Sequence, residues 1–195
     1  LIVNGAECEP FITANYRECM ENTENILEGV YMLKRIMGFK RVIICVEDNK
    51  PKAIEALYSI AADLRDADDT VKLMKLRSHY PQGAEKTLIK RVMGRKVPSG
   101  GLPADAGVIV DNISTVKAIS DAIQKGMPLI ERVTTITGEK IKNPGNFIIK
   151  IGTSVRDLID YCGGFTDDDV LVKMGGPMMG IAQYDLRTPV VKGTS

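Results

Sequence analysis

Short apolar runs alternate with amphipathic stretches over roughly the first two thirds of the chain. Residues 42–46 are almost continuously apolar, which is typical of a strand covered on both faces. Within residues 21–37 the apolar positions recur every three or four residues, and this spacing predicts a helix with one buried face. The predicted strands are residues 1–3, 41–47, 70–76 and 107–110, and the predicted helices are 21–37, 51–65 (with Ile54, Leu57, Ala61 and Leu64 buried), 82–93 and 114–124. Strands and helices in alternation predict an α/β fold, a largely parallel sheet with helices on both faces.

The pattern changes after Pro128. Residues 130–138 are rich in threonine and valine, and further strands are expected at residues 147–151 and 170–174, with a short helix at 155–162 between them. This order predicts a small mixed α+β unit. We therefore expect two domains, residues 1–127 and 128–195.

Composition narrows the class of protein. The 195 residues carry a formal net charge of +1, which gives no electrostatic footprint for nucleic acid or an acidic membrane surface. The four cysteines show no C-x-x-C spacing, so no metal site or disulfide framework is predicted and a reduced, cytoplasmic setting is expected. No apolar run is long enough to span a membrane. The chain starts without methionine inside a strand-like run, as expected for a soluble piece of a longer protein.

Three polar clusters follow predicted strands. The first is Asn4, Glu7 and Glu9, the second is residues 80–85 and the third is residues 111–115. Ligands of open α/β sheets bind at the carboxyl ends of the strands, and helix N-termini there favour anions. Each cluster taken alone is explained by turns and helix caps, such as Asp111, Asn112 and Ser114. Their convergence on one sheet edge favours a binding site.

Other expected signatures are missing from the sequence. There is no G-x-G-x-x-G phosphate loop, and Gly100-Gly101 precedes a strand, as in a simple turn. His79 is the only histidine, and no nucleophile and base stand in an obvious pair. The glutamates of the clusters have no evident water-activating partner, as a hydrolase would need. We therefore predict no catalytic side chain and no metal ligand in this chain.

Several stretches, taken in order, resemble a known family. They are residues 2–10, 46–51, 80–85, 94–103, 175–180 and 188–194. Together they resemble the C subunit of the Rnf electron-transport complex, a ferredoxin–NAD oxidoreductase coupled to ion transport. That family is similar to the flavin-bearing, NADH-oxidising subunit of respiratory complex I. Residues 143–177 resemble the soluble-ligand-binding β-grasp (SLBB) module, so the resemblance implies this fold for the second domain.

The resemblance also implies a set of cofactor-binding residues. Asn4 and Glu7 are expected to line a pocket for flavin mononucleotide (FMN) and the nicotinamide nucleotide, which Glu9 approaches. Glu85 is expected near the flavin ring and the nicotinamide. Asn112 and Thr115 are expected to hold the flavin phosphate. The complex I pattern has an acid, an asparagine and a glutamate at the positions where this chain has Ala6, Asp111 and Ser114.

The implied function is electron transfer among ferredoxin, iron–sulfur centres, FMN and NAD(H). The partners implied are ferredoxin or flavodoxin and the other subunits of a membrane complex, with this subunit peripheral on the cytoplasmic side. The family also has an upstream glycine-rich flavin loop and a downstream domain with [4Fe-4S] clusters, so this piece alone is expected to be inactive. Two alternatives stay open: a cobalamin reductase-like microcompartment flavoprotein, and a non-catalytic docking module that uses Met178 and Met179 as a contact surface.

Overall fold

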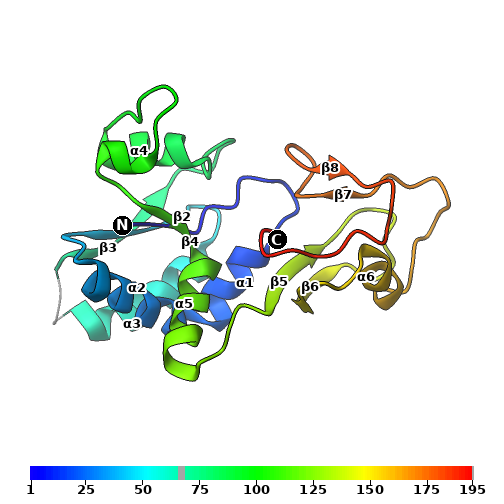
Figure 1. Ribbon diagram of the computed structural model, residues 1–195, viewed down its shortest axis with the longest axis horizontal. Helices are drawn as coiled ribbons and strands as arrows, with labels where there is room; N and C mark the ends of the chain where they lie inside the picture. The colour runs from blue at the N-terminus through cyan, green and yellow to red at the C-terminus, as the bar shows by residue number, and fades with distance from the viewer. Residues whose placement is uncertain (66–68, 195) are drawn as a thin grey trace. The chain divides into compact units, whose positions relative to one another are not determined.

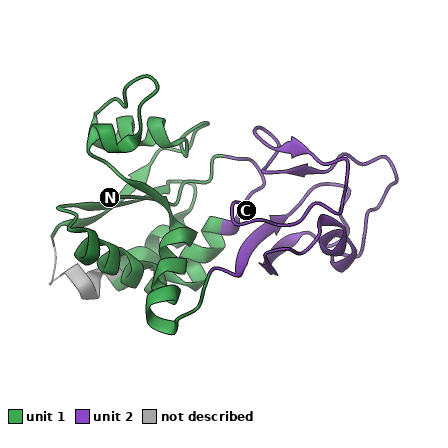
Figure 2. Cartoon of the chain, in the orientation of Figure 1, with its two compact units in different colours: residues 1–8, 15–128 green, residues 9–14, 129–195 purple. Residues whose placement is uncertain are grey.

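The computed structural model describes residues 1–65 and 69–194, with the side chains of residues 61–65 left out of the description (Figure 1). Ala61 and Leu64, predicted to continue a buried stripe, therefore lie outside the described side chains. The chain forms two compact units (Figure 2). Unit 1 comprises residues 1–8 and 15–128, and unit 2 comprises residues 9–14 and 129–195.

Unit 1 is built on a four-stranded parallel sheet in the order β3-β2-β1-β4. The strands are β1 (Ile2–Asn4), β2 (Val42–Glu47), β3 (Val71–Leu76) and β4 (Val110–Asn112). β1 lies between β2 and β4, and Asn4 is in register with Cys45 on one side and Asn112 on the other. The chain order reverses across β1, which makes the ends of β1 and β4 a topological switch point.

Successive side chains of the strands point to two separate cores, because side chains alternate along a strand. Val3, Ile44 and Val46 pack with α1 (Ala14–Glu21), α2 (Thr23–Met37), α3 (Pro51–Arg65) and α5 (Ile113–Lys125). Ile2 and Ile43 pack on the opposite face with α4 (Glu85–Met93) and the 3-10 helix η1 (Pro103–Ala106). Figure 1 shows α4 apart from the other helices across the sheet. The predicted parallel sheet with helices on both faces is confirmed.

Three boundaries differ from the sequence prediction. The predicted helix at 21–37 is preceded by a separate α1, which the pattern did not reveal. The fourth strand lies at Val110–Asn112 instead of 107–110, because residues 103–106 are helical and Gly107 ends that turn with φ +70°. α4 begins at Glu85 instead of residue 82, since residues 80–84 form a turn in which the backbone N–H of Gln82 donates to the carbonyl of His79.

Unit 2 is a small α+β unit, as predicted. β5 (Glu131–Ile136) and β6 (Gly145–Lys150) form an antiparallel hairpin, α6 (Val155–Tyr161) follows, and β7 (Lys173–Met174) pairs with β8 (Ile181–Ala182). Its core contains Ile141, Val155, Ile159 and Cys162. The predicted strand at 170–174 is shorter than expected, with only its last two residues paired.

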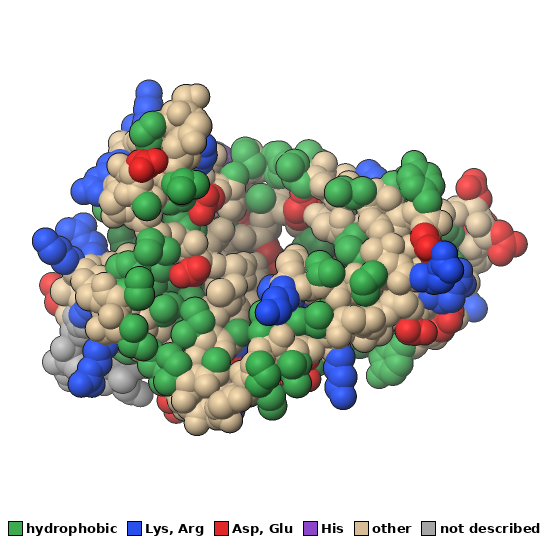
Figure 3. Space-filling model, viewed as in Figure 1, with side chains coloured by type: hydrophobic (Ala, Val, Ile, Leu, Met, Phe, Trp, Pro, Cys, Tyr) green, Lys and Arg blue, Asp and Glu red, His purple; other side chains and the backbone are tan. Residues whose placement is uncertain are grey.

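Residues 9–14 belong to unit 2 although they are flanked in sequence by unit 1. The Thr13 amide donates to Thr135 Oγ1 at 3.0 Å, and the Thr13 hydroxyl exchanges hydrogen bonds with the Asn146 side chain. None of the helices in the described part of the chain combines the length and apolar character needed to cross a bilayer. Basic and acidic side chains are interspersed on the face drawn in Figure 3.

Candidate functional site

The carboxyl edge of the unit 1 sheet collects polar side chains from three strands. Asn4 ends β1, Glu47 ends β2 and Asn112 ends β4. Because Asn4 and Asn112 are register partners on adjacent strands, their amide side chains leave the sheet at the same point. Two of the three predicted clusters therefore begin side by side.

Asn4 connects this edge to the second predicted cluster. Its Nδ2 donates to the carbonyl of Gly83 at 3.0 Å, and its Oδ1 accepts the Ala6 amide at 3.1 Å. Gly83 approaches the loop after β1 closely, since a Cβ atom at this position would lie 3.1 Å from the Ala6 carbonyl oxygen. The Asn4 side chain thus bridges the backbone of the loop after β1 and the backbone of the loop before α4.

Glu7 is buried at the N-terminus of α1. Its carboxylate accepts the amides of Asn15 at 2.7 Å and Tyr16 at 3.2 Å, and Lys50 Nζ lies 4.0 Å away. The side chain is 3% exposed. Burial raises the pKa of Glu7 from 4.5 to about 7, although the bonds from Asn15 and Tyr16 and the charge of Lys50 lower it in part. Glu7 therefore holds the start of a helix, where the free N–H groups need an acceptor.

A hydrogen-bond chain links Glu7 to the third cluster. The backbone N–H of Asn15 donates to Glu7. The side-chain oxygen of Asn15 accepts a hydrogen bond from the Ser114 hydroxyl at 3.2 Å. The Ser114 amide in turn donates to Asn112 Oδ1 at 2.9 Å. Asn112 is thus the N-cap of α5, as the simpler interpretation of the sequence holds, and it belongs to the same network as Glu7. Thr115 follows in the first turn of α5 and is half-buried.

The two remaining predicted residues lie differently. Glu85 is the first residue of α4, two positions after Gly83, and its side chain is exposed. Glu9 belongs to unit 2. There its carboxylate accepts the amides of Met178 and Met179 at 2.9 and 2.8 Å. Met178 and Met179 are 57% and 72% exposed, so they do not fill a core.

Two polar residues at this edge were not predicted as site residues. Glu47 is 1% exposed, and its carboxylate accepts the Glu7 amide at 3.0 Å. Its position as the last residue of an apolar strand was a usable signal. Gln82 is fully buried, and neither its Nε2 nor its Oε1 has a hydrogen-bond partner among the described residues. No pattern in the sequence distinguishes it from a surface glutamine in a turn.

The edge offers chemistry that fits a flavin better than a metal. Amides, hydroxyls and helix N-termini suit a phosphate and the polar rim of a flavin ring, and the unpartnered amide of Gln82 has hydrogen-bonding capacity in reserve. Within the described residues no group of three or more His, Cys, Asp or Glu side chains could hold a metal ion. Burial raises the pKa of the Cys19 and Cys45 thiols to about 12, so they stay protonated at neutral pH.

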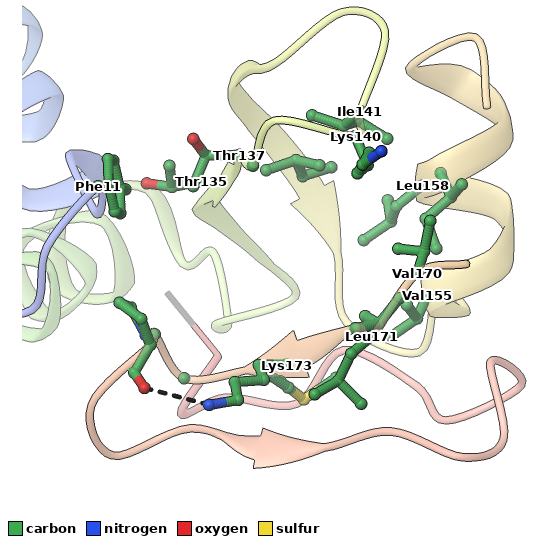
Figure 4. Close-up of a pocket in the computed structure, with 18 of the residues that line it drawn as sticks. Phe11, Thr135, Thr137, Lys140, Ile141, Val155, Leu158, Val170, Leu171 and Lys173 are labelled. Atoms are coloured by element: carbon green, nitrogen blue, oxygen red, sulfur yellow. Dashed lines mark hydrogen bonds between the residues drawn. The ribbon is translucent and has the colours of Figure 1, made fainter. Parts of the chain in front are cut away.

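Unit 2 contains a separate apolar pocket with a volume of about 420 Å³ (Figure 4). Its walls include Phe11, Ile141, Val155, Leu158 and Leu171. None of the six predicted cofactor-binding residues is among the residues that line it. The pocket therefore does not correspond to the predicted flavin site.

Comparison with known proteins supports the resemblance. The chain is 50% identical over 194 residues to the C subunit of the proton-translocating ferredoxin:NAD(+) oxidoreductase complex of Clostridium ljungdahlii, covering 100% of this chain and 41% of that protein. It is 44% identical to the C subunit of the Na(+)-translocating ferredoxin:NAD(+) oxidoreductase complex of Acetobacterium woodii, covering 100% of this chain and 43% of that protein. The chain thus spans less than half the length of these curated relatives. The predicted similarity to C subunits of this class is confirmed.

Solved structures and family models agree on the fold. A crystal structure of an NAD+-reducing [NiFe]-hydrogenase in the H2-reduced state superposes with a TM-score of 0.77 at 17% identity, covering 99% of this chain and 38% of that chain. The SLBB domain model matches residues 133–182, and the model described as the Nuo51 FMN-binding domain matches residues 1–121. Since the latter covers more than half of the sequence, this chain belongs to the Nuo51 FMN-binding domain family and carries an SLBB domain after it.

Proposed function

We propose that this chain is the FMN- and NAD(H)-binding part of an electron-transfer subunit in a membrane-bound, ion-translocating ferredoxin:NAD oxidoreductase. The observation that carries the proposal is the bonded edge of unit 1, where Asn4 holds the loop at Gly83 and Glu7 connects through Asn15 to the cap of α5. The names of the relatives supply the class of complex, and the matched family supplies the flavin.

The proposed partners are NAD(H), ferredoxin or flavodoxin, and the other subunits of the complex at the cytoplasmic side of the membrane. The [4Fe-4S] clusters are proposed for the part of the relatives' length that this chain does not span. Bound FMN supplies the exchange between two-electron hydride chemistry and one-electron transfer, and the protein orients it.

Each residue of the edge has a proposed task. Asn112 and Thr115 lie at the N-terminus of α5, where the helix dipole favours an anion, so they are proposed to hold the FMN phosphate. Asn4 is proposed to form a hydrogen bond to the flavin ring with its side-chain amide. Glu85, exposed at the start of α4, is proposed to orient the nicotinamide. Glu7 fixes the loop and the start of α1, and its carboxylate is occupied by that task.

The test uses the full-length protein that contains this chain, reconstituted with FMN and desalted. We expect retained flavin absorbance and NADH oxidation, with the rate lowered about tenfold by Glu85→Gln through loss of about 1.4 kcal/mol of transition-state stabilisation. Glu55→Gln, the same change at an exposed position of α3, is the control and is expected to retain the wild-type rate. Absence of flavin after reconstitution, together with an unaffected Glu85→Gln rate, would show that the site assignment is wrong.

A second candidate function is a docking module formed by unit 2. The exposure of Met178 and Met179 favours it, because adjacent exposed methionines are adaptable contact residues. Replacing both methionines by serine is then expected to weaken co-purification with the other subunits while flavin content stays unchanged. Equal co-purification of the variant and the wild type would exclude this function for these two side chains.

A further inference from the structure

Glu9 makes a bond pattern that the proposed function does not use. Its Oε2 accepts the amide of Met178 at 2.9 Å, and its Oε1 accepts the amide of Met179 at 2.8 Å. Both carboxylate oxygens are therefore engaged by two consecutive backbone N–H groups. Such pairs of backbone donors hold anions, and hydrogen bonds to a charged acceptor are stronger than neutral ones.

The turn that receives Glu9 is shaped to fit it. Residues 175–180, called here the 175–180 turn, read Gly-Gly-Pro-Met-Met-Gly. A Cβ atom at Gly176 would lie 2.5 Å from Glu9 Oε2 and 2.9 Å from its Cδ, so only glycine allows the carboxylate to approach. Since Met178 and Met179 are mostly exposed, side-chain burial contributes little to holding this turn. The Gly180 amide closes the turn by donating to the Gly176 carbonyl at 2.9 Å, and Lys173 Nζ donates to the Pro177 carbonyl at 3.3 Å. The backbone amides of Met178 and Met179 themselves are held by Glu9.

Glu7 has the same pattern in unit 1, where it accepts the consecutive amides of Asn15 and Tyr16. The two glutamates of Glu7-Cys8-Glu9 thus each hold a pair of neighbouring peptide groups, one in each unit. The peptide joining Cys8 to Glu9 is also the point where the chain passes from unit 1 to unit 2. A carboxylate fixed on either side of that point restrains the backbone that follows Asn4.

We propose that Glu9 is a positioning residue: it latches the 175–180 turn onto residues 9–14 and thereby restrains the loop after β1, instead of contacting the nicotinamide nucleotide. The expected effect of Glu9 variants on the KM for NADH rests on the proposed function, whereas the hydrogen bonds between Glu9 and the 175–180 turn do not. The two parts are measured separately, so failure of one is distinguishable from failure of the other.

The first measurement is amide hydrogen exchange of Met178 and Met179 in the full-length protein without nucleotide. Glu9→Ala is expected to speed exchange at these amides about tenfold, because both acceptors are lost. Glu9→Gln keeps an acceptor oxygen and is expected to fall between Glu9→Ala and the wild type. Gly176→Ala places a methyl group against Glu9 and is expected to match Glu9→Ala.

Gly175→Ala is the matched control for backbone strain. Gly175 and Gly176 have φ values of +104° and +96°, yet the atoms nearest to a Cβ at Gly175 belong to Gly180 and not to Glu9. The amount by which Gly176→Ala speeds amide exchange beyond Gly175→Ala therefore measures the contribution of the latch. The double variant with Glu9→Ala and Gly176→Ala is expected to exchange no faster than Glu9→Ala alone. If Gly176→Ala does not fold, the two Glu9 variants still decide.

The second measurement is the KM for NADH in FMN-reconstituted protein. A latch predicts that KM rises across the variants in the order in which amide protection falls, with a smaller change in kcat. Unchanged exchange in Glu9→Ala would overturn the latch. A Glu9→Gln variant with wild-type exchange and a KM as high as that of Glu9→Ala would show instead that the Glu9 charge contacts the nucleotide. Lack of FMN binding by the wild type would contradict the proposed function and leave the exchange result standing.

Discussion

The carboxylate of Glu7 is held by backbone amides in a site that water barely reaches. Two N–H groups at the start of α1 and the ammonium group of Lys50 favour its charged form, and burial opposes it more strongly. The result is a pKa of about 7 in place of 4.5. At the scale of one residue, the loop after β1 therefore carries a group that titrates near neutral pH.

This pKa predicts how stability depends on pH. Between pH 4.5 and about 7 the folded state binds a proton at Glu7 that the unfolded state has released, so the free energy of unfolding falls as pH rises through this range. Above about pH 7, the buried charge of Glu7 lowers the free energy of unfolding by about 3 kcal/mol. Glu7→Gln is expected to remove this fall, so that its gain over the wild type grows from pH 5 to pH 8.

Urea unfolding followed by far-ultraviolet circular dichroism at both pH values measures the effect. Among the described elements, α6 is the one helix of unit 2, so the signal reports mainly unit 1. Glu55→Gln, at an exposed position, controls for loss of a negative charge. Parallel pH profiles for the wild type and Glu7→Gln would contradict the assignment.

At the scale of elements, unit 1 depends on the close approach of α2 and α5. Gly29 of α2 is buried, and a Cβ atom there would collide with the carbonyl oxygen of Val116 in α5 and lie 3.0 Å from its Cγ1. The Asn112 cap fixes where α5 starts, so the register of this contact follows from the end of β4. The packing of α2 against α5 therefore depends on the same residue, Asn112, that lies at the polar edge of the sheet.

Gly29→Ala is expected to destabilise unit 1 by about 1–3 kcal/mol, because overpacking against a backbone carbonyl cannot be relieved by a rotamer change. Helix propensity alone predicts the opposite, a gain of about 1 kcal/mol. Gly193→Ala is the control, since a Cβ atom there has no neighbour within 4 Å. Urea midpoints decide between the two, and a more stable Gly29→Ala protein would show that α2 and α5 can move apart at little cost.

At the scale of the whole molecule, the chain is two units with separate cores. Unit 1 has a core on each face of its sheet, and the core of unit 2 lies around Ile159 and Cys162. Separate cores allow each unit to open without the other. The boundary between the units is not a single point in the sequence, since residues 9–14 belong to unit 2 although unit 1 precedes and follows them.

Ile159→Ala tests this independence. The side chain is 7% exposed in the core of unit 2, and its truncation is expected to cost about 2–5 kcal/mol there. Hydrogen exchange is expected to speed up for the amides of β5 and β6 and to stay unchanged for those of β2. Equal acceleration in β2 would show that the two units unfold together.

Much of the fold follows from local pattern. The continuous apolar run of β2, the stripe of α2 and the Pro51 start of α3 were predictable because each is written in a few adjacent residues. The start of β4 was not, since Val110–Asn112 is a strand only through its pairing with β1. The site followed the same division: Asn4 and Asn112 could be expected at one edge, while the burial of Gln82 could not.

The sequence by itself determined the alternation of strands and helices in most of unit 1 and the family, because periodicity and motifs are properties of neighbouring positions. Only the tertiary structure decided which backbone amides each glutamate receives. Glu7 and Glu9 stand two residues apart and look equivalent in sequence, yet one holds α1 and the other holds a turn 169 residues away. Hydrogen-bond partners so distant in the chain are fixed by packing, which no local pattern encodes.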